Sequence, residues 1–235
     1  MNVETKSASQ VCSYEFCDGG SCSRQSSPEE EYCQWHARRE KKQITSSPNP
    51  SNRPLEGAYL KDAVIESVDF DGVELSRSDL SGASIADVSF NNTTLNGTTL
   101  ASASLSQVDF VNCSLDNVDA RQSTFDNVSF QAGSLNGADL EGSELLMIEF
   151  DQCSLNNAKL VGITSRESDL RNTSLTEAQL SGEFHRPNFL SVDADGAMIS
   201  NVAMYEGTIR QGSFDRAAFI DSAFHSLRLV DTSLD

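Results

Sequence analysis

The sequence predicts an all-β solenoid with a square cross-section over residues 55–235, preceded by a small module rich in cysteine. Three observations support this prediction. Apolar residues recur every five positions, the same residue type recurs every twenty, and charge is absent from two of every five positions. A fixed short period is typical of a stacked architecture in which each unit buries its apolar side against its neighbours.

The five-residue period starts at Leu55 and runs without interruption to Leu180. Of the 26 positions reached in steps of five, 24 hold Leu, Ile or Phe, and the exceptions are Ala120 and Ser165. Most residues two positions before a centre are small or β-branched, as at Ala58. Because five residues fit neither the helical period nor plain strand alternation, the pattern predicts a coiled chain of short segments.

A twenty-residue period lies within the first one. Phenylalanine recurs every twenty residues from Phe70 to Phe150, and leucine does so from Leu75 to Leu175. Identical apolar side chains stacked at a strand spacing of about 4.8 Å form a continuous ladder. One coil therefore takes four pentapeptides, which predicts four sides and about nine coils.

The distribution of charge tests this assignment independently. None of the 37 centre positions and none of the 36 positions two residues before a centre is charged, although residues 51–235 carry 28 acids and 11 bases. An unpaired charge is costly to bury, so these two positions are predicted to face the interior and the other three to face water.

The repeat resembles the pentapeptide-repeat family, whose pattern is roughly Ala-(Asp/Asn)-Leu-x-x. Matching stretches are Ser78-Asp79-Leu80, Val108-Asp109-Phe110, Ala138-Asp139-Leu140 and Ser168-Asp169-Leu170. The resemblance implies a right-handed quadrilateral β-helix.

The register slips by one residue between Leu180 and Phe184, after which the centres run in steps of five to Leu234. Pro187, which lacks an amide proton, stands nearby at an inward position. We expect a kink or distorted corner within residues 181–190, most simply a tolerated deletion. His185 beside it is expected at the surface or a corner and not as a ligand.

A second motif lies in the N-terminal segment, where cysteines 12, 17, 22 and 33 and His36 give the spacing C-x4-C-x4-C-x10-C-x2-H. Ser27, Pro28 and Glu30 have the character of a helix start, which predicts a helix over about residues 28–42. Cys33 and His36 would share one face of that helix. A segment this short cannot build a stable apolar core, so a structural metal, with zinc as first candidate, would supply the missing stability.

This segment also resembles the short N-terminal zinc-binding-like motifs of some haloarchaeal pentapeptide-repeat proteins, through its Cys-Gln-Trp-His ending. The resemblance implies Cys12, Cys22, Cys33 and His36 as ligands, with Cys17 as a possible substitute. Disulfides, or reduced thiols in a disordered tail, are the alternatives.

The chain thus divides into a zinc-binding module at residues 1–42, a Pro/Ser-rich linker at 43–54 and the repeat region at 55–235. The remaining cysteines, Cys113 and Cys153, occupy inward positions two coils apart. That separation of roughly 10 Å is too long for a disulfide, so both are expected as small core residues.

No catalytic constellation emerges, and we expect no enzymatic activity. The net charge of −18, the absence of a long apolar run and the lack of an apolar signal core indicate a cytoplasmic protein that binds neither membranes nor nucleic acid directly. The favoured function is a protein-binding scaffold with an unidentified partner or self-association through coil ends. The alternative, drawn from the family resemblance, is an acidic DNA mimic that binds a type II topoisomerase (DNA gyrase) and inhibits or protects it.

Overall fold

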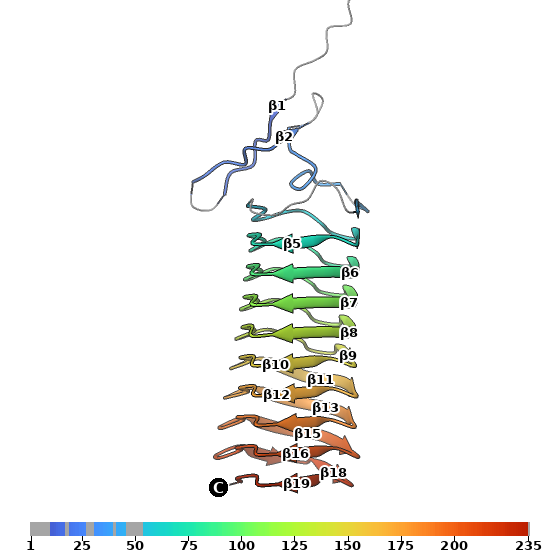
Figure 1. Cartoon of the computed structure of the whole chain (residues 1–235), viewed down its shortest axis with the longest axis vertical. Helices are drawn as coiled ribbons and strands as arrows, with labels where there is room; N and C mark the ends of the chain where they lie inside the picture. The colour runs from blue at the N-terminus through green and yellow to red at the C-terminus, as the bar shows by residue number, and fades with distance from the viewer. Residues whose placement is uncertain (1–9, 17–18, 27–30, 40, 46–53, 235) are drawn as a thin grey trace, which may run out of the picture.

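Residues 54–234 wind into a stack of coils, with the N-terminal module at one end and the C-terminal coil at the other (Figure 1). The computed structural model describes residues 10–16, 19–26, 31–39, 41–45 and 54–234. Within these ranges no helix is long and apolar enough to cross a membrane.

The described residues form 19 strands. Two belong to the N-terminal module and pair antiparallel: β1 (Gln10–Val11) and β2 (Gln25–Ser26). The other 17 form one sheet. These are β3 (Gln43–Thr45), β4 (Val64–Glu66), β5 (Asp69–Asp71), β6 (Ser84–Asn91), β7 (Ser104–Val111), β8 (Thr124–Gln131), β9 (Glu144–Leu146), β10 (Glu149–Asp151), β11 (Lys159–Arg166), β12 (Asp169–Arg171), β13 (Gln179–His185), β14 (Asn188–Leu190), β15 (Met198–Tyr205), β16 (Thr208–Arg210), β17 (Ala218–Ile220), β18 (Ala223–His225) and β19 (Arg228–Val230).

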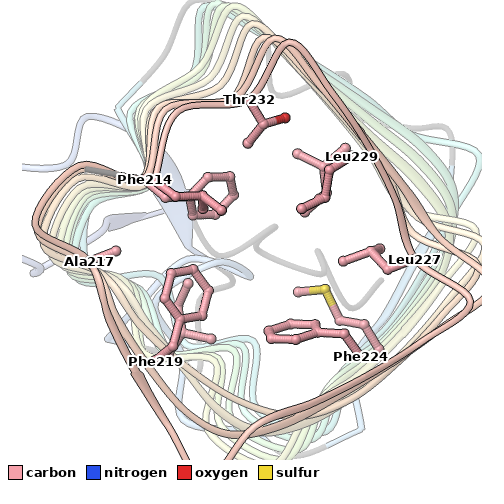
Figure 2. Close-up of a pocket in the computed structure, with 11 residues that line it drawn as sticks. Phe214, Ala217, Phe219, Phe224, Leu227, Leu229 and Thr232 are labelled. Atoms are coloured by element: carbon pink, nitrogen blue, oxygen red, sulfur yellow. The ribbon is translucent and has the colours of Figure 1, made fainter.

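The register of this sheet confirms the coil length predicted from the sequence. Strands of successive coils pair in parallel with an offset of twenty residues, so that Phe70 faces Phe90 and Phe90 faces Phe110. A chain of parallel bridges that starts at Pro54 and Glu74 reaches Ser233 in nine steps, which gives about nine coils. Seen along the axis, the superposed coils have a four-sided outline (Figure 2).

The inward positions form a continuous apolar core. Rings of the phenylalanine column stack nearly parallel, with centroids 4.8 Å apart between Phe90 and Phe110 and 4.6 Å apart between Phe110 and Phe130. Cys113 and Cys153 are buried in the same core as free thiols, each donating to a backbone carbonyl of the preceding coil. Burial raises the pKa of both thiols, that of Cys113 to about 11. Their assignment as core residues is confirmed.

Each corner of the coil depends on a residue in the left-handed region of backbone space. It stands two positions after the centre, as Gly72, Arg77 and Asn92 illustrate with φ values of 63°, 59° and 50°. None of the residues with positive φ is β-branched, because a branched Cβ crowds the backbone in this conformation. This corner rule explains how a five-residue unit can turn the chain.

A polar ladder reinforces one corner across the coils. Asn136 Oδ1 accepts hydrogen bonds from Ser154 Oγ at 2.6 Å and from the Asn156 backbone N–H at 3.0 Å, one coil further on. Asn156 repeats the arrangement with Ser174 and Thr176. Side-chain amides thus satisfy backbone donors at a turn, where strand pairing cannot.

The distorted corner expected within residues 181–190 lies at Ser181. Where β11 and β13 pair, Leu160 faces Leu180, whereas Ile163 faces Gly182, so one residue is missing from β13. The neighbouring corner of β11 contains Gly162 with φ of 64°, and it is this left-handed residue that has no counterpart. Gly182, with φ of 111°, instead takes the inward position two residues before Phe184.

Gly182→Ala is expected to lower the free energy of unfolding by about 3 kcal/mol. The alanine would be strained at a positive φ, and its Cβ would also collide with the backbone of the preceding coil. A Cβ at this residue would lie 2.1 Å from the carbonyl oxygen of Ile163. Gly162→Ala is the matched control, since its Cβ would meet nothing within 4 Å and should cost about 1 kcal/mol. Urea unfolding measures both, and equal losses would contradict the assignment of the deletion to Ser181.

Candidate metal centre

A short hairpin in the N-terminal module brings two of the predicted ligands together. The strands β1 and β2 pair at its open end. Beyond them, the backbone N–H of Cys12 donates to the Arg24 carbonyl at 2.8 Å and that of Cys22 donates to the Tyr14 carbonyl at 2.9 Å. Cys12 and Cys22 therefore lie across from one another on adjacent legs of the hairpin.

The other two ligands lie on a single turn. The N–H groups of His36 and Ala37 both donate to the carbonyl of Cys33, at 3.1 and 2.9 Å. This turn places Cys33 Sγ 3.4 Å from His36 Nδ1, so the spacing of three residues does put the two side chains side by side.

The prediction of a helix over residues 28–42 is wrong. Residues 31–39 contain only this turn, while residues 27–30, with the predicted cap and first turn, lie outside the described residues. The carbonyl of Trp35 accepts from the N–H of Tyr59 at 2.8 Å, and the carbonyl of Lys42 accepts from the N–H of Val64 in the first coil at 2.7 Å. Because the solenoid uses these carbonyls, tertiary contacts override the local helix signal.

Residues Cys12, Cys22, Cys33 and His36 converge on one point, and their donor atoms all lie within 4.8 Å of one another. Two further separations are 3.7 Å from Cys12 Sγ to His36 Nδ1 and 3.9 Å from Cys22 Sγ to Cys33 Sγ. Ligand atoms around a tetrahedral zinc ion are roughly 3.4 to 3.8 Å apart. All four side chains are buried, so the cluster could hold a metal ion.

Neighbouring backbone groups orient two of the donors. The N–H of Cys33 donates to Cys12 Sγ at 3.2 Å and so holds this sulfur in place. His36 Nε2 lies 3.1 Å from the carbonyl oxygen of Glu56, so this nitrogen carries the proton and Nδ1 keeps its lone pair for an ion. Sequence reasoning missed Glu56, which reaches the site only because the first coil packs against the module.

Burial controls the protonation of the donor set. It raises the pKa of the Cys22 thiol to about 12, raises that of Cys33 as well, and lowers the pKa of His36 to about 4. The desolvated site thus opposes thiolates in the absence of a nearby cation. A divalent ion would supply that charge and displace the thiol protons. The affinity for the metal should therefore decrease as the pH is lowered. Cys17, the predicted substitute ligand, lies outside the described residues.

The module also closes the N-terminal end of the solenoid. Trp35 is fully buried and meets Phe70, the first ring of the phenylalanine column, edge-on with centroids 6.3 Å apart. Lys42 donates from Nζ to the carbonyls of Trp35 and Tyr59, and burial lowers its pKa to about 8. Gln43–Thr45, at the start of the expected linker, form β3 and pair with β4, while residues 46–53 lie outside the described ones.

The fold and this cluster define a β-solenoid repeat protein whose N-terminal cap contains a Cys/His cluster that could hold a metal ion. Residues 63–140 and 103–180 each match the family model of the pentapeptide repeat region. Together they span half of the sequence, and the chain belongs to the pentapeptide-repeat family.

Solved structures of other pentapeptide-repeat proteins are similar to this chain. HetL, which is involved in regulating heterocyst differentiation in the cyanobacterium Nostoc sp. strain PCC 7120, has 21% identity and a TM-score of 0.38 over 84% of this chain and 89% of its own. QnrB1, a plasmid-mediated fluoroquinolone resistance protein, has 16% identity and a TM-score of 0.37 over 82% and 92%. Rfr23 from the cyanobacterium Cyanothece 51142 has 13% identity and a TM-score of 0.24 over 77% and 91%. At such low similarity, the family assignment rests on the family model. No curated protein matches the chain significantly.

Proposed function

We propose that the protein is a non-catalytic, protein-binding scaffold, and that the C-terminal end of its solenoid binds a second copy of the chain. The observation that carries this proposal is the apolar surface of the last described coil. Its inward side chains surround a hollow of about 330 Å³ and point toward one another across it (Figure 2). Phe219, Phe224 and Leu229 are 42%, 42% and 47% exposed there, whereas their counterparts in inner coils are buried.

The geometry of the two ends favours a second copy over an unrelated partner. Among the residues that the structure describes, the strands β17, β18 and β19 pair only toward the preceding coil, which leaves their outer edges able to bond another strand. Another coil end of the same four-sided shape would cover all of these edges together. Because the described part of the N-terminal module covers the opposite end, the matching surface on a second copy is its own C-terminal coil, which gives a closed two-fold dimer.

The non-catalytic part of the proposal is supported by the histidines outside the metal cluster. His185 and His225 stack on opposite faces of Tyr205, with centroids 4.8 and 5.0 Å away. His185 lies 3.4 Å from the Glu183 carboxylate, as expected for a surface residue. The proposal also includes zinc as the metal. It includes a cytoplasmic location as well, because cysteine ligands stay reduced in a reducing compartment.

Leu229→Glu is expected to convert a dimer into a monomer, since it places a charge in the centre of the apolar contact. Sedimentation velocity at high salt measures the association state. Met147→Glu is the matched control, because Met147 is 52% exposed but lies on the side of the solenoid. A wild-type protein that is monomeric at micromolar concentration, or a dimer that survives Leu229→Glu, would overturn the proposed dimer.

The alternative function is the DNA mimic that binds DNA gyrase. It is favoured by the charge of residues 51–235, whose 28 acids and 11 bases give a formal net charge of −17 on a regular rod. Ion pairs such as Arg121–Asp119 and Arg171–Asp169 neutralise part of this surface. Three results together would favour mimicry over the dimeric scaffold. The protein would inhibit gyrase at low salt, the inhibition would fade as the salt concentration rises, and the monomeric variant Leu229→Glu would inhibit gyrase equally well.

A further inference from the structure

A hollow of about 670 Å³ lies where the N-terminal module meets the first coils of the solenoid. Three tyrosines line it, Tyr14 and Tyr32 from the module and Tyr59 from the first coil. Its size lies within the range of roughly 300 to 1,000 Å³ that is typical of sites for small molecules. The hollow borders the metal cluster through His36 and is separate from the C-terminal surface.

One wall of the hollow is held rigidly in place. The Tyr14 ring stacks on His36 with centroids 4.0 Å apart and an interplanar angle of 5°. Gly57 makes room for this ring, because a Cβ there would lie 1.7 Å from Tyr14 Oη. An aromatic wall that is fixed before a ligand arrives loses little conformational entropy on binding.

The hollow also contains guanidinium groups that can accept an anion. Arg38 is exposed, and no hydrogen bond or ion pair to its side chain is present within the described part of the chain. Arg77 makes one contact of 3.3 Å with Glu56 Oε1, which leaves most of its donors free. The one carboxylate in the lining, Asp79, already accepts from the N–H and hydroxyl of Ser81 at 3.0 and 2.6 Å.

The charge around the hollow contrasts with the rest of the molecule. The segment from Arg38 to Lys42 holds four basic residues and one acid, in a chain with 35 acids and 17 bases. A small anion is therefore repelled by most of the surface and attracted to this junction.

We propose that this hollow binds a small planar anion, namely an aromatic ring that carries a carboxylate or a phosphate. The tyrosine rings provide stacking surfaces, and the guanidinium forks of Arg38 and Arg77 match the oxygens of either anion. Since the site lies at the opposite end from the dimer surface, this inference does not depend on the proposed function.

Calorimetric titration of the full chain tests the proposal with benzoate and adenosine 5′-monophosphate as anionic probes, and with benzamide and adenosine as their neutral counterparts. We expect at least one anionic probe to bind about tenfold more tightly than its neutral counterpart. The probe that binds distinguishes a carboxylate from a phosphate ligand.

Substitutions then locate the binding. Arg38→Gln and Arg77→Gln should each weaken the anionic probe about tenfold, and Tyr59→Leu should weaken it by removing a ring. Arg121→Gln is the control, because Arg121 lies in another surface hollow beside Asp119. Unchanged melting temperatures show that the variants fold. The proposal is overturned if anionic and neutral probes bind alike, or if Arg38→Gln and Arg121→Gln have equal effects.

Discussion

Replacing Phe110 by alanine is expected to lower the free energy of unfolding by about 3 to 5 kcal/mol. The ring is 2% exposed and lies between Phe90 and Phe130, so its loss leaves a cavity that both neighbours border. The flanking coils cannot collapse into this cavity, because their backbone spacing is fixed by strand pairing. Urea unfolding followed by circular dichroism measures the loss.

Asp109→Ala, one residue away, provides the control. The carboxylate faces water and accepts a single side-chain hydrogen bond, from Ser129 Oγ at 2.5 Å. We expect a loss within about 0.5 kcal/mol, as for most surface substitutions. If the two variants were equally damaging, the division into inward and outward positions would be wrong.

Purified protein is expected to contain about one zinc ion per chain, and its removal should open the N-terminal cap. Chelation returns the buried thiols to their protonated state and removes the bond that joins the hairpin to the Cys33 turn. Trp35, the one tryptophan in the chain, reports this directly because it is fully buried against Phe70. Its fluorescence should shift to longer wavelength on chelation, while the β signal of the repeat region persists.

Cys33→Ser should release the ion, whereas Cys17→Ser and the core variant Cys153→Ser should retain it.

Lowering the pH should have the same effect on the N-terminal module as chelation. The pKa of His36 falls from 6.5 to about 4 on folding, so the unfolded module binds the proton more tightly. The stability from neutral His36 is therefore complete above pH 6.5 and is lost as the pH falls toward 4. Metal analysis that finds no ion under reducing conditions would contradict the assignment.

The repeat region was predictable because its information is periodic. Charged residues are excluded from the same two positions of the five-residue unit in every coil. Phe110 and Asp109 could therefore be assigned to the interior and the surface from the sequence alone. The left-handed corners were not predicted, although the absence of β-branched residues two positions after each centre was a visible signal. The conformation of Gly182 could not be predicted, since it depends on the backbone of Ile163 in the preceding coil.

The metal cluster was predictable in composition but not in surroundings. Spacing gave five candidate ligands, and the family resemblance implied the four whose donor atoms the structure brings within 4.8 Å of one another. The helix prediction failed because a local cap signal carries no information about Trp35 and Lys42, whose carbonyls bond to the first coil. The role of Glu56 behind His36 likewise depends on how the two parts pack.

The nearly constant offset between coils, twenty residues everywhere except at the deletion beside Ser181, gives the solenoid a fixed rise per coil. Each coil adds one rung of about 4.8 Å, so nine rungs hold the capped end and the open end roughly 43 Å apart. Duplication of one coil would lengthen this distance by one rung and leave both ends chemically unchanged, because each coil contacts only its neighbours. Evolution can thus adjust the reach of such a protein in fixed steps, independently of what either end binds.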